Sequence, residues 1–157
     1  MAAGLTVTRE KLAPLRAYLE EQLRERVETA RGTDHIAIDG AITAGAATGE
    51  LWSMIERAGP FGAGNPEPMF ALPSHIVSFA DPVGAAHVRV RLRAGDGKQI
   101  GAIAFRALNR PLGDALLAAR GRPLHVAGTL SLDRWNGQER IEMRVCDAAP
   151  AEPLTAR

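Results

Sequence analysis

The spacing of hydrophobic residues changes once along this chain, at a stretch rich in glycine and proline. Before residue 59, leucines recur at steps of three and four, which is typical of an amphipathic helix. After residue 70, apolar and polar residues alternate, which is typical of strands. The stretch between them reads GPFGAGNPEPMF. Glycine adopts conformations that other residues avoid, and proline removes a backbone donor. The stretch therefore predicts a folded loop and neither a helix nor an inner strand.

The residues before the loop predict two helices and a short strand. A long helix is expected over about Arg9–Arg31, with Thr8 as its N-cap and Gly32 as its stop. We interpret its apolar face as packing against the helix's own domain, in preference to a partner protein. A strand is predicted over His35–Gly40 and a second helix over Gly49–Ala58. The apolar face of the long helix consists of Leu12, Leu15, Leu19, Leu23, Val27 and Ala30.

The residues after the loop predict five strands and one further helix. The helix, about Pro111–Arg120, falls between the third and fourth strands, and Asn136-Gly137 is a strong hairpin signal between the fourth and fifth. This order is that of an OB-fold, a partly open Greek-key barrel. The strands are expected at about Phe70–Phe79, His87–Arg93, Gln99–Arg106, Leu124–Leu132 and Arg140–Asp147.

The predicted fold class is therefore α+β, with an N-terminal helical segment followed by a five-stranded OB-fold-like barrel. We divide the chain into a helical segment at residues 1–58, a linker loop at 59–70, the barrel domain at 71–148 and a flexible tail at 149–157. In the linker loop, at least one glycine is expected to need a positive φ.

Composition and charge narrow the protein class without naming a function. The net charge is only +1, although residues 59–157 hold 12 Lys/Arg against 9 Asp/Glu. A single cysteine, Cys146, excludes an internal disulfide and a cysteine-based zinc cluster. No apolar run approaches the ~20 residues that a membrane span needs. The N-terminus lacks the pattern of a signal peptide. We therefore expect a cytoplasmic protein.

The second predicted strand carries the clearest candidate site. Arg89, Arg91 and Arg93 alternate with aliphatic residues, so the three arginines should share one face of the strand. Lys98 and Arg106 add to this basic character, and Asp96 is the only acid within residues 87–106. In OB-folds the face of strands two and three is the usual oligonucleotide surface. We favour nucleic-acid binding over an ordinary solvated face, and we place Ile100, Ala102 and Ala104 of the third strand on the same face.

The predicted hairpin between strands four and five is a second candidate contact. Arg134 and Trp135 lie beside its turn. The tryptophan ring can stack on a base or fold back over the end of the barrel, and the sequence leaves both possibilities open.

Catalytic and metal-binding patterns are thin. The four histidines are widely separated, and the sequence contains no HExxH motif, P-loop or nucleophile elbow. His125 reads as an ordinary strand residue, and Cys146 reads as a buried small apolar side chain in preference to a nucleophile. The chain by itself does not look like an enzyme, and no catalytic, metal or cofactor site is assigned.

Several segments of the chain resemble a known family. PFGAGNPEPMF, HVRVRL, AIAF and LHVAGTLSLDRWNGQERIEMRVCDAAP resemble the C-terminal part of RecJ-type single-strand-specific 5′→3′ DNA exonucleases of the DHH phosphoesterase superfamily. AAGLTVTREKLAPLRAYLEE resembles the end of their DHHA1 domain. The resemblance implies an OB domain that binds single-stranded DNA in repair and recombination. It also implies that an intact family enzyme uses Mn²⁺ or Mg²⁺.

The family's catalytic carboxylates and histidines lie upstream of any residue in this sequence. Its Gly-Gly-His motif should come just before Ala2-Ala3-Gly4, where this sequence begins at Met1. We therefore expect a cloned fragment, a partial gene product or a stand-alone protein that is inactive alone. The alternative function is a protein-interaction module, with other repair proteins as partners or with self-association through residues 9–31.

Overall fold

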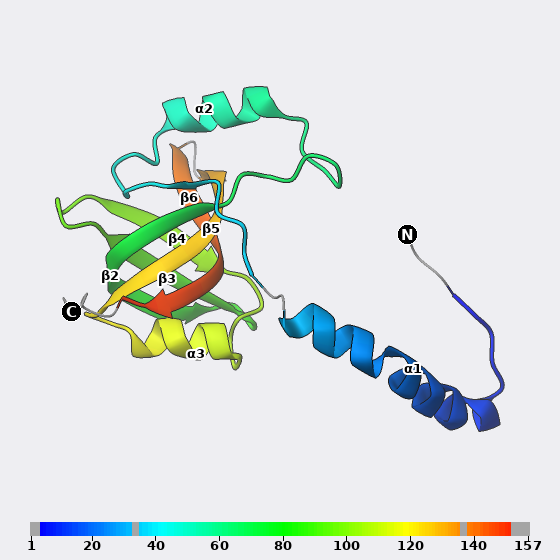
Figure 1. Cartoon of the computed structure of the whole chain (residues 1–157). Helices are drawn as coiled ribbons and strands as arrows, with labels where there is room; N and C mark the ends of the chain where they lie inside the picture. Colours follow the sequence, from blue (N-terminus) through cyan, green and yellow to red (C-terminus); the bar gives the residue numbers. More distant parts are fainter. Residues whose placement is uncertain (1–3, 33–34, 136–137, 152–157) are drawn as a thin grey trace, which may run out of the picture. The chain divides into compact units, whose positions relative to one another are not determined.

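The computed structural model describes residues 4–32, 35–135 and 138–151, with the backbone only for residues 30–32, 135 and 138. The chain divides into two compact units, Met1–Ile36 and Ala37–Arg157. The first contains the N-terminal helix, and the second contains the β-barrel (Figure 1). The second unit therefore includes the Gly/Pro-rich loop and the helix before it, which the sequence division placed outside the barrel domain.

The first unit is built on the predicted long helix. It begins with a short 3₁₀ turn, Arg9–Lys11, and continues as α1, Leu12–Gly32. Thr8 lies at the N-cap position of this turn, as predicted. The Thr8 side chain forms no capping hydrogen bond, and only its carbonyl oxygen accepts one, from the Lys11 N–H at 3.0 Å. The helix also continues through Gly32 instead of stopping before it.

The second unit is a closed five-stranded barrel with the predicted OB-fold order. Its strands neighbour one another in the order β2-β3-β4-β6-β5, and the pairing of β2 with β5 closes the barrel. β4 and β6 are parallel, whereas all other neighbours in the barrel are antiparallel. α3, Pro111–Ala118, lies between β4 and β5 in the chain and begins with its proline as predicted. The strands are β2 (Phe70–Val83), β3 (His87–Arg93), β4 (Gln99–Ala104), β5 (Pro123–Trp135) and β6 (Gln138–Pro150).

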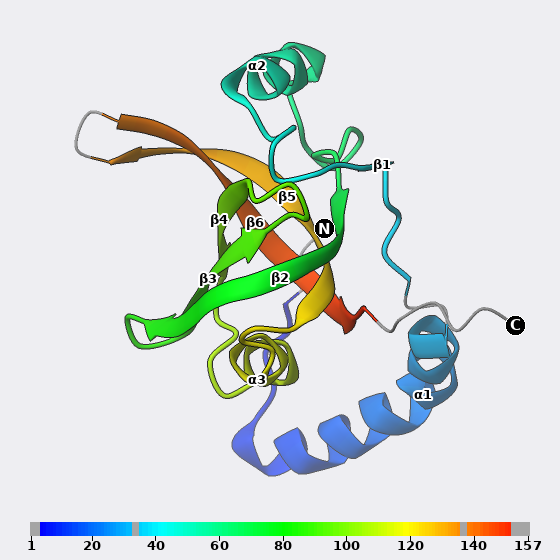
Figure 2. The same ribbon diagram turned by 90° about the vertical axis from the view of Figure 1, so that its left-hand side faces the viewer.

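The core lies inside the barrel, and the two helices of this unit lie at its opposite ends (Figure 1). α3 contributes the fully buried Leu116. α2, Gly49–Ala58, packs Leu51, Trp52 and Ile55 against the core. The hairpin of β5 and β6 extends away from the barrel (Figure 2). The largest fully buried side chains are Leu72, Leu92, Leu116, Met143, Val77, Val88, Val90 and Val126.

Two corrections concern the ends of the sheet. The strand predicted over His35–Gly40 is reduced to β1, Gly40–Ala41, which pairs in parallel with the start of β2. Next to it, the Asp39 N–H donates to the Met69 carbonyl oxygen at 2.8 Å, and the Asp39 carboxylate accepts the Met69 N–H at 2.7 Å. At the other terminus, β6 continues to Pro150, paired with Leu124, so residues 149 and 150 belong to the sheet and not to a tail.

The Gly/Pro-rich stretch is a folded loop, as predicted. Gly62 and Asn65 exchange two backbone hydrogen bonds of 2.8 and 3.1 Å. The Asn65 side-chain amide also donates to the carbonyl oxygens of Ala58 and Pro60, both at 3.2 Å. The expected positive φ is absent from the loop. The glycines with positive φ lie elsewhere, at Gly84, Gly97 and Gly121.

Histidines hold an irregularity in β2. The register of β2 against β5 shifts between Leu72 and His75, and Ser74 there has a φ of 52°. The Ser74 N–H donates to His125 Nδ1 at 3.3 Å. His75 is buried, and its Nε2 accepts the Ala44 N–H at 3.0 Å. Since Nε2 accepts, Nδ1 carries the proton and donates to the Pro73 carbonyl oxygen at 2.9 Å.

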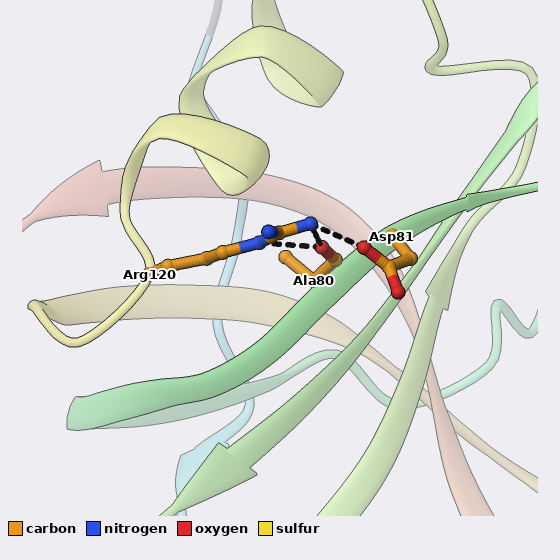
Figure 3. A network of polar contacts seen from close by, with 3 residues as sticks. All are labelled: Ala80, Asp81 and Arg120. Atoms are coloured by element: carbon orange, nitrogen blue, oxygen red, sulfur yellow. Dashed lines mark hydrogen bonds and ion pairs between the residues drawn. The ribbon is translucent and has the colours of Figure 1, made fainter.

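Arg120 binds the edge of β2 beyond Ile76, where β2 no longer pairs with β5. Its guanidinium donates to the Ala80 carbonyl oxygen, with Nε at 2.7 Å, and also binds the Asp81 carboxylate (Figure 3). These contacts satisfy strand groups that have no partner strand on this side. They also engage the carboxylate that lies opposite Arg89 in the β2–β3 register.

Candidate nucleic-acid interface

The alternation predicted for the basic strand is confirmed in β3. Val88, Val90 and Leu92 are at most 1% exposed and face the core. Arg89, Arg91 and Arg93 are exposed on the opposite face. The arginines therefore lie on the outer surface of the barrel, and their aliphatic neighbours anchor the strand that carries them.

The prediction of which β4 residues share this outer face was wrong by one position. In the register of β3 and β4, Arg91 lies opposite Gly101 and Arg89 opposite Ile103. The assigned residues Ile100, Ala102 and Ala104 pair with the core aliphatics and are at most 4% exposed. Directly opposed residues in a sheet share a face, so the outer face of β4 consists of Gln99, Gly101 and Ile103.

A groove of about 860 Å³ lies on this outer face. Its walls come from strands that are distant in sequence, because β4 is followed by β6 in the sheet. Its charged residues are Arg89 and Arg91 from β3, Asp133 from β5, and Arg140 and Glu142 from β6. The remaining lining residues are Phe79, Val90, Gln99, Ile100, Gly101, Ile103 and Ile141. The groove is large enough for a small organic ring system or a short stretch of an extended chain.

The carboxylates in the groove are a feature that the local sequence around β3 does not show. Burial raises the pKa of Glu142 above the ordinary value of a glutamate, and the neighbouring Asp133 raises it further. Arg89 and Arg144 oppose this shift. Glu142 is therefore a partly desolvated carboxylate beside arginines, and the groove presents both hydrogen-bond donors and acceptors.

Phe79 is the aromatic residue among the described residues that line the groove, and it is not one of the residues predicted to bind. It is 43% exposed and lies opposite Arg91 in the β2–β3 register. A bulge between Val77 and Phe79 changes the alternation of β2 here, and the Ser78 hydroxyl donates to the Arg91 carbonyl oxygen at 3.0 Å. The signal in the sequence was weak because a bulge reverses the faces that simple alternation predicts.

A second exposed aromatic lies at the end of β4 and outside the groove. Phe105 is 54% exposed, and its ring contacts the His87 ring edge-on, with centroids 5.1 Å apart. Arg106, predicted as a strand residue, instead lies in the turn after β4 with a φ of 55°. Its N–H donates to His87 Nδ1 at 2.9 Å. The predicted site residue Arg106 is therefore beyond the strand and does not line the groove.

The other predicted contacts also lie outside the groove lining. Arg93 lies opposite Gln99 next to the β3–β4 turn. Lys98 lies in that turn, and its side chain lies close to Gly45. A β-carbon built on Gly45 would be 3.2 Å from Lys98 Nζ. Arg134 forms an ion pair with Glu139, with Nε 2.9 Å from Oε1. The side chain of Trp135 and the Asn136-Gly137 turn lie outside the described residues, so both predictions about that tryptophan stay open.

The described part of the chain contains no group of three or more His, Cys, Asp or Glu residues placed to hold a metal ion. Cys146 is exposed, which corrects the prediction of a buried side chain. Partial desolvation nevertheless raises the pKa of its thiol, so Cys146 is a weak nucleophile at neutral pH. No helix among the described residues is long and apolar enough to cross a membrane.

Comparison with known proteins identifies the family of this barrel. Residues 38–147 match the RecJ OB domain, so the chain belongs to this family. The chain is 23% identical over 154 residues to the single-stranded-DNA-specific exonuclease RecJ of Bacillus subtilis, an alignment that covers 97% of this chain and 19% of that protein.

Two crystal structures of RecJ from Thermus thermophilus also resemble the chain. The complex with Mn²⁺ shares 25% identity and gives a TM-score of 0.59, over 88% of this chain and 20% of the other. The complex with Mg²⁺ shares 23% identity and gives a TM-score of 0.55, over 87% and 21%. The chain thus spans about a fifth of the length of these relatives.

Proposed function

We propose that this chain binds single-stranded DNA, as the OB-fold part of a RecJ-like 5′→3′ exonuclease of DNA repair and recombination. The observation that carries the proposal is the groove over β3 and β4, which combines Arg89, Arg91 and the exposed ring of Phe79. This is the face that OB-folds commonly use for oligonucleotides. The name of the Bacillus subtilis relative, a single-stranded-DNA-specific exonuclease, supports the same ligand.

The groove offers the two interactions on which single-strand binding depends. Guanidinium groups bind backbone phosphates, often through paired hydrogen bonds. An exposed aromatic ring stacks on bases of any sequence. Arg120 supports this use of the site, because it occupies the Asp81 carboxylate that otherwise lies opposite Arg89. Arg89 is thereby more available to a phosphate.

The proposal is tested by measuring how salt changes the affinity for a labelled oligo-dT, using fluorescence anisotropy. Log affinity should fall linearly with log salt, by roughly 0.7 for each phosphate contact on a single strand. Replacing Arg89 and Arg91 with Ala should weaken binding and flatten this slope. Both residues are exposed, so the melting temperature should change little.

Arg24→Ala with Arg26→Ala is the matched control, because it removes the same charge from exposed positions of α1. This control should bind with nearly the wild-type slope. If the Arg89/Arg91 variant keeps the wild-type slope, the groove is not the nucleic-acid site. If the wild-type protein does not bind oligo-dT even at low salt, the proposed function is wrong.

We further propose that the chain does not cleave DNA by itself. The proposal rests on the lack, among the described residues, of a cluster of carboxylates and histidines such as two-metal phosphoester cleavage uses. Highly purified protein with Mn²⁺ should leave a labelled single strand intact. Degradation that a chelator abolishes would contradict this.

A further inference from the structure

The floor of the groove contains one row of residues that suggests recognition of a base as well as of phosphates. The strand registers place Phe79, Arg91, Gly101 and Glu142 side by side on β2, β3, β4 and β6. All four line the groove. Arg91 supplies hydrogen-bond donors only, and an ionised Glu142 supplies acceptors only. A donor group and an acceptor group thus flank a position that has no side chain.

Gly101 keeps this position flat. A β-carbon built on Gly101 would lie 3.5 Å from Glu142 Oε1 and 3.9 Å from its Cγ. The Glu142 side chain therefore lies next to the space above the glycine. Neighbouring strands are ~4.8 Å apart, so the Cα atoms of Arg91 and Glu142 are about 10 Å apart. Both side chains are long enough to meet the edge of a flat ring resting between them.

A carboxylate at this position has a specific consequence for a nucleic-acid ligand. It repels phosphate, so it weakens binding unless it forms a hydrogen bond with another part of the strand. The groups of DNA that donate to a carboxylate are the ring N–H and exocyclic amino groups of bases. The partial desolvation that raises the pKa of Glu142 makes such a hydrogen bond worth more than it would be in water.

We propose that Glu142, with Arg91 across Gly101, recognises a base that carries an exocyclic amino group beside a ring acceptor, as in cytosine. The carboxylate accepts from the amino group, and the guanidinium donates to the ring nitrogen or carbonyl oxygen. Uracil and thymine present a carbonyl oxygen in place of the amino group and a ring N–H in place of the ring acceptor. In the same pose, an acceptor therefore faces the carboxylate and a donor faces the guanidinium. This inference rests on the proposed single-strand binding and adds a base preference to it.

The test compares the full chain binding to labelled oligo-dC and oligo-dU of equal length at neutral pH and fixed salt. These two bases differ by the amino group and the adjacent ring proton, and neither carries the thymine methyl group. We expect wild-type protein to prefer oligo-dC by about tenfold, which is within the range for a wrong base in direct readout. Equal affinities in the wild-type protein would overturn the inference without any variant.

Two variants separate recognition from charge. Glu142→Gln should bring the two affinities to within about twofold, because an amide offers both a donor and an acceptor. Glu139→Gln makes the same charge change on the same hairpin, outside the groove, and should keep the wild-type preference. If both variants keep the preference, Glu142 does not recognise the base. Binding of both oligonucleotides without preference overturns only this inference, whereas binding of neither overturns the proposed function as well.

Discussion

Phe79 is the residue whose role the structure changes most. Its ring is 43% exposed in the groove, beside Arg91. The candidate site was predicted from the pattern of basic residues, which does not point to this ring. We predict that Phe79→Ala weakens oligo-dT binding by about 1–3 kcal/mol, the value of one stacked base. The slope of log affinity against log salt should not change, because stacking releases no counterions.

Phe105→Ala is the matched control for this prediction. It removes another exposed phenylalanine ring, one that does not line the groove, and it should bind like the wild-type protein. A Phe79 variant with wild-type affinity would show that no base stacks on this ring. Trp135→Ala is expected to act as Phe79→Ala does if that indole stacks on a base, and this stays a prediction.

Glu142 gives a pH dependence whose sign is fixed by its environment. Its folded-state pKa is raised by burial and by Asp133, so the folded protein binds a proton more readily than the unfolded chain does. The ionised carboxylate therefore destabilises the fold above the raised pKa, and this penalty disappears as the pH falls toward the ordinary pKa of a glutamate. We predict that Glu142→Gln raises the melting temperature at pH 7–8.

The difference in melting temperature between the variant and the wild-type protein should shrink as the pH is lowered from the raised pKa toward the ordinary pKa of a glutamate. Thermal unfolding at a series of pH values measures it, and Glu139→Gln, exposed and ion-paired with Arg134, is the control. A melting temperature for Glu142→Gln below that of the wild-type protein at neutral pH would contradict the prediction. It would mean that the attraction of Arg89 and Arg144 outweighs the cost of burial.

At the scale of single residues, the sequence predicted the local alternation and missed everything that depends on register. The exposed arginines and buried aliphatics of β3 follow from period two alone. The face of β4 does not, because the turn between the strands sets which residues oppose Arg89 and Arg91, and a shift of one residue exchanges the faces. Asp133 and Glu142 reach the groove from β5 and β6, more than forty residues after Arg89 and Arg91 in the chain.

At the scale of elements, the positions that demand glycine are not those in the Gly/Pro-rich loop. Neither Gly62 nor Gly64 has a positive φ, and a β-carbon at either would meet nothing within 4 Å. Gly62→Val or Gly64→Val is therefore not expected to damage folding through backbone strain or overlap. Gly128 is different. It lies at the β5–β6 register shift, and a β-carbon there would overlap the backbone carbonyl of Arg144.

We therefore predict that Gly128→Ala destabilises the fold by roughly 1–3 kcal/mol or more, because a backbone neighbour cannot move aside without disturbing the strand pair. Gly62→Ala should stay within about 0.5 kcal/mol of the wild-type free energy of unfolding. Urea titrations followed by circular dichroism measure both. A Gly128 variant as stable as Gly62→Ala would show that β5 and β6 separate easily at this point.

The elements themselves were largely predictable, and their tertiary hydrogen bonds were not. Thr48 caps α2, because its hydroxyl accepts the Leu51 N–H at 3.3 Å, and such a cap is a local signal in the sequence. The contacts of His75 with Ala44, and of Arg120 with β2, join residues thirty or more positions apart. No periodicity in the sequence encodes which distant backbone group such a side chain will meet.

At the scale of the whole molecule, the two compact units differ in how their apolar residues are used. The barrel unit buries its own core. The described elements of the helix unit are only α1 and its 3₁₀ turn. Within that unit, no second described element can pack against the apolar face of α1, which we call the leucine stripe. Leu12, Leu19, Leu23 and Val27 are 57%, 41%, 44% and 42% exposed. The expectation that this stripe packs against the helix's own domain therefore finds no support within the helix unit.

We predict that the chain self-associates through this stripe. Pairing two copies buries leucine side chains, and each Å² of apolar surface buried contributes ~25 cal/mol of favourable free energy. Sedimentation velocity over a range of concentrations should show a reversible shift from monomer toward dimer. Leu19→Glu, which puts a charge into the stripe, should abolish the shift. Ala17→Glu adds the same charge on another side of α1 and should leave it intact. A wild-type protein that sediments as a monomer at high concentration would contradict the prediction, and so would an association that Leu19→Glu leaves unchanged.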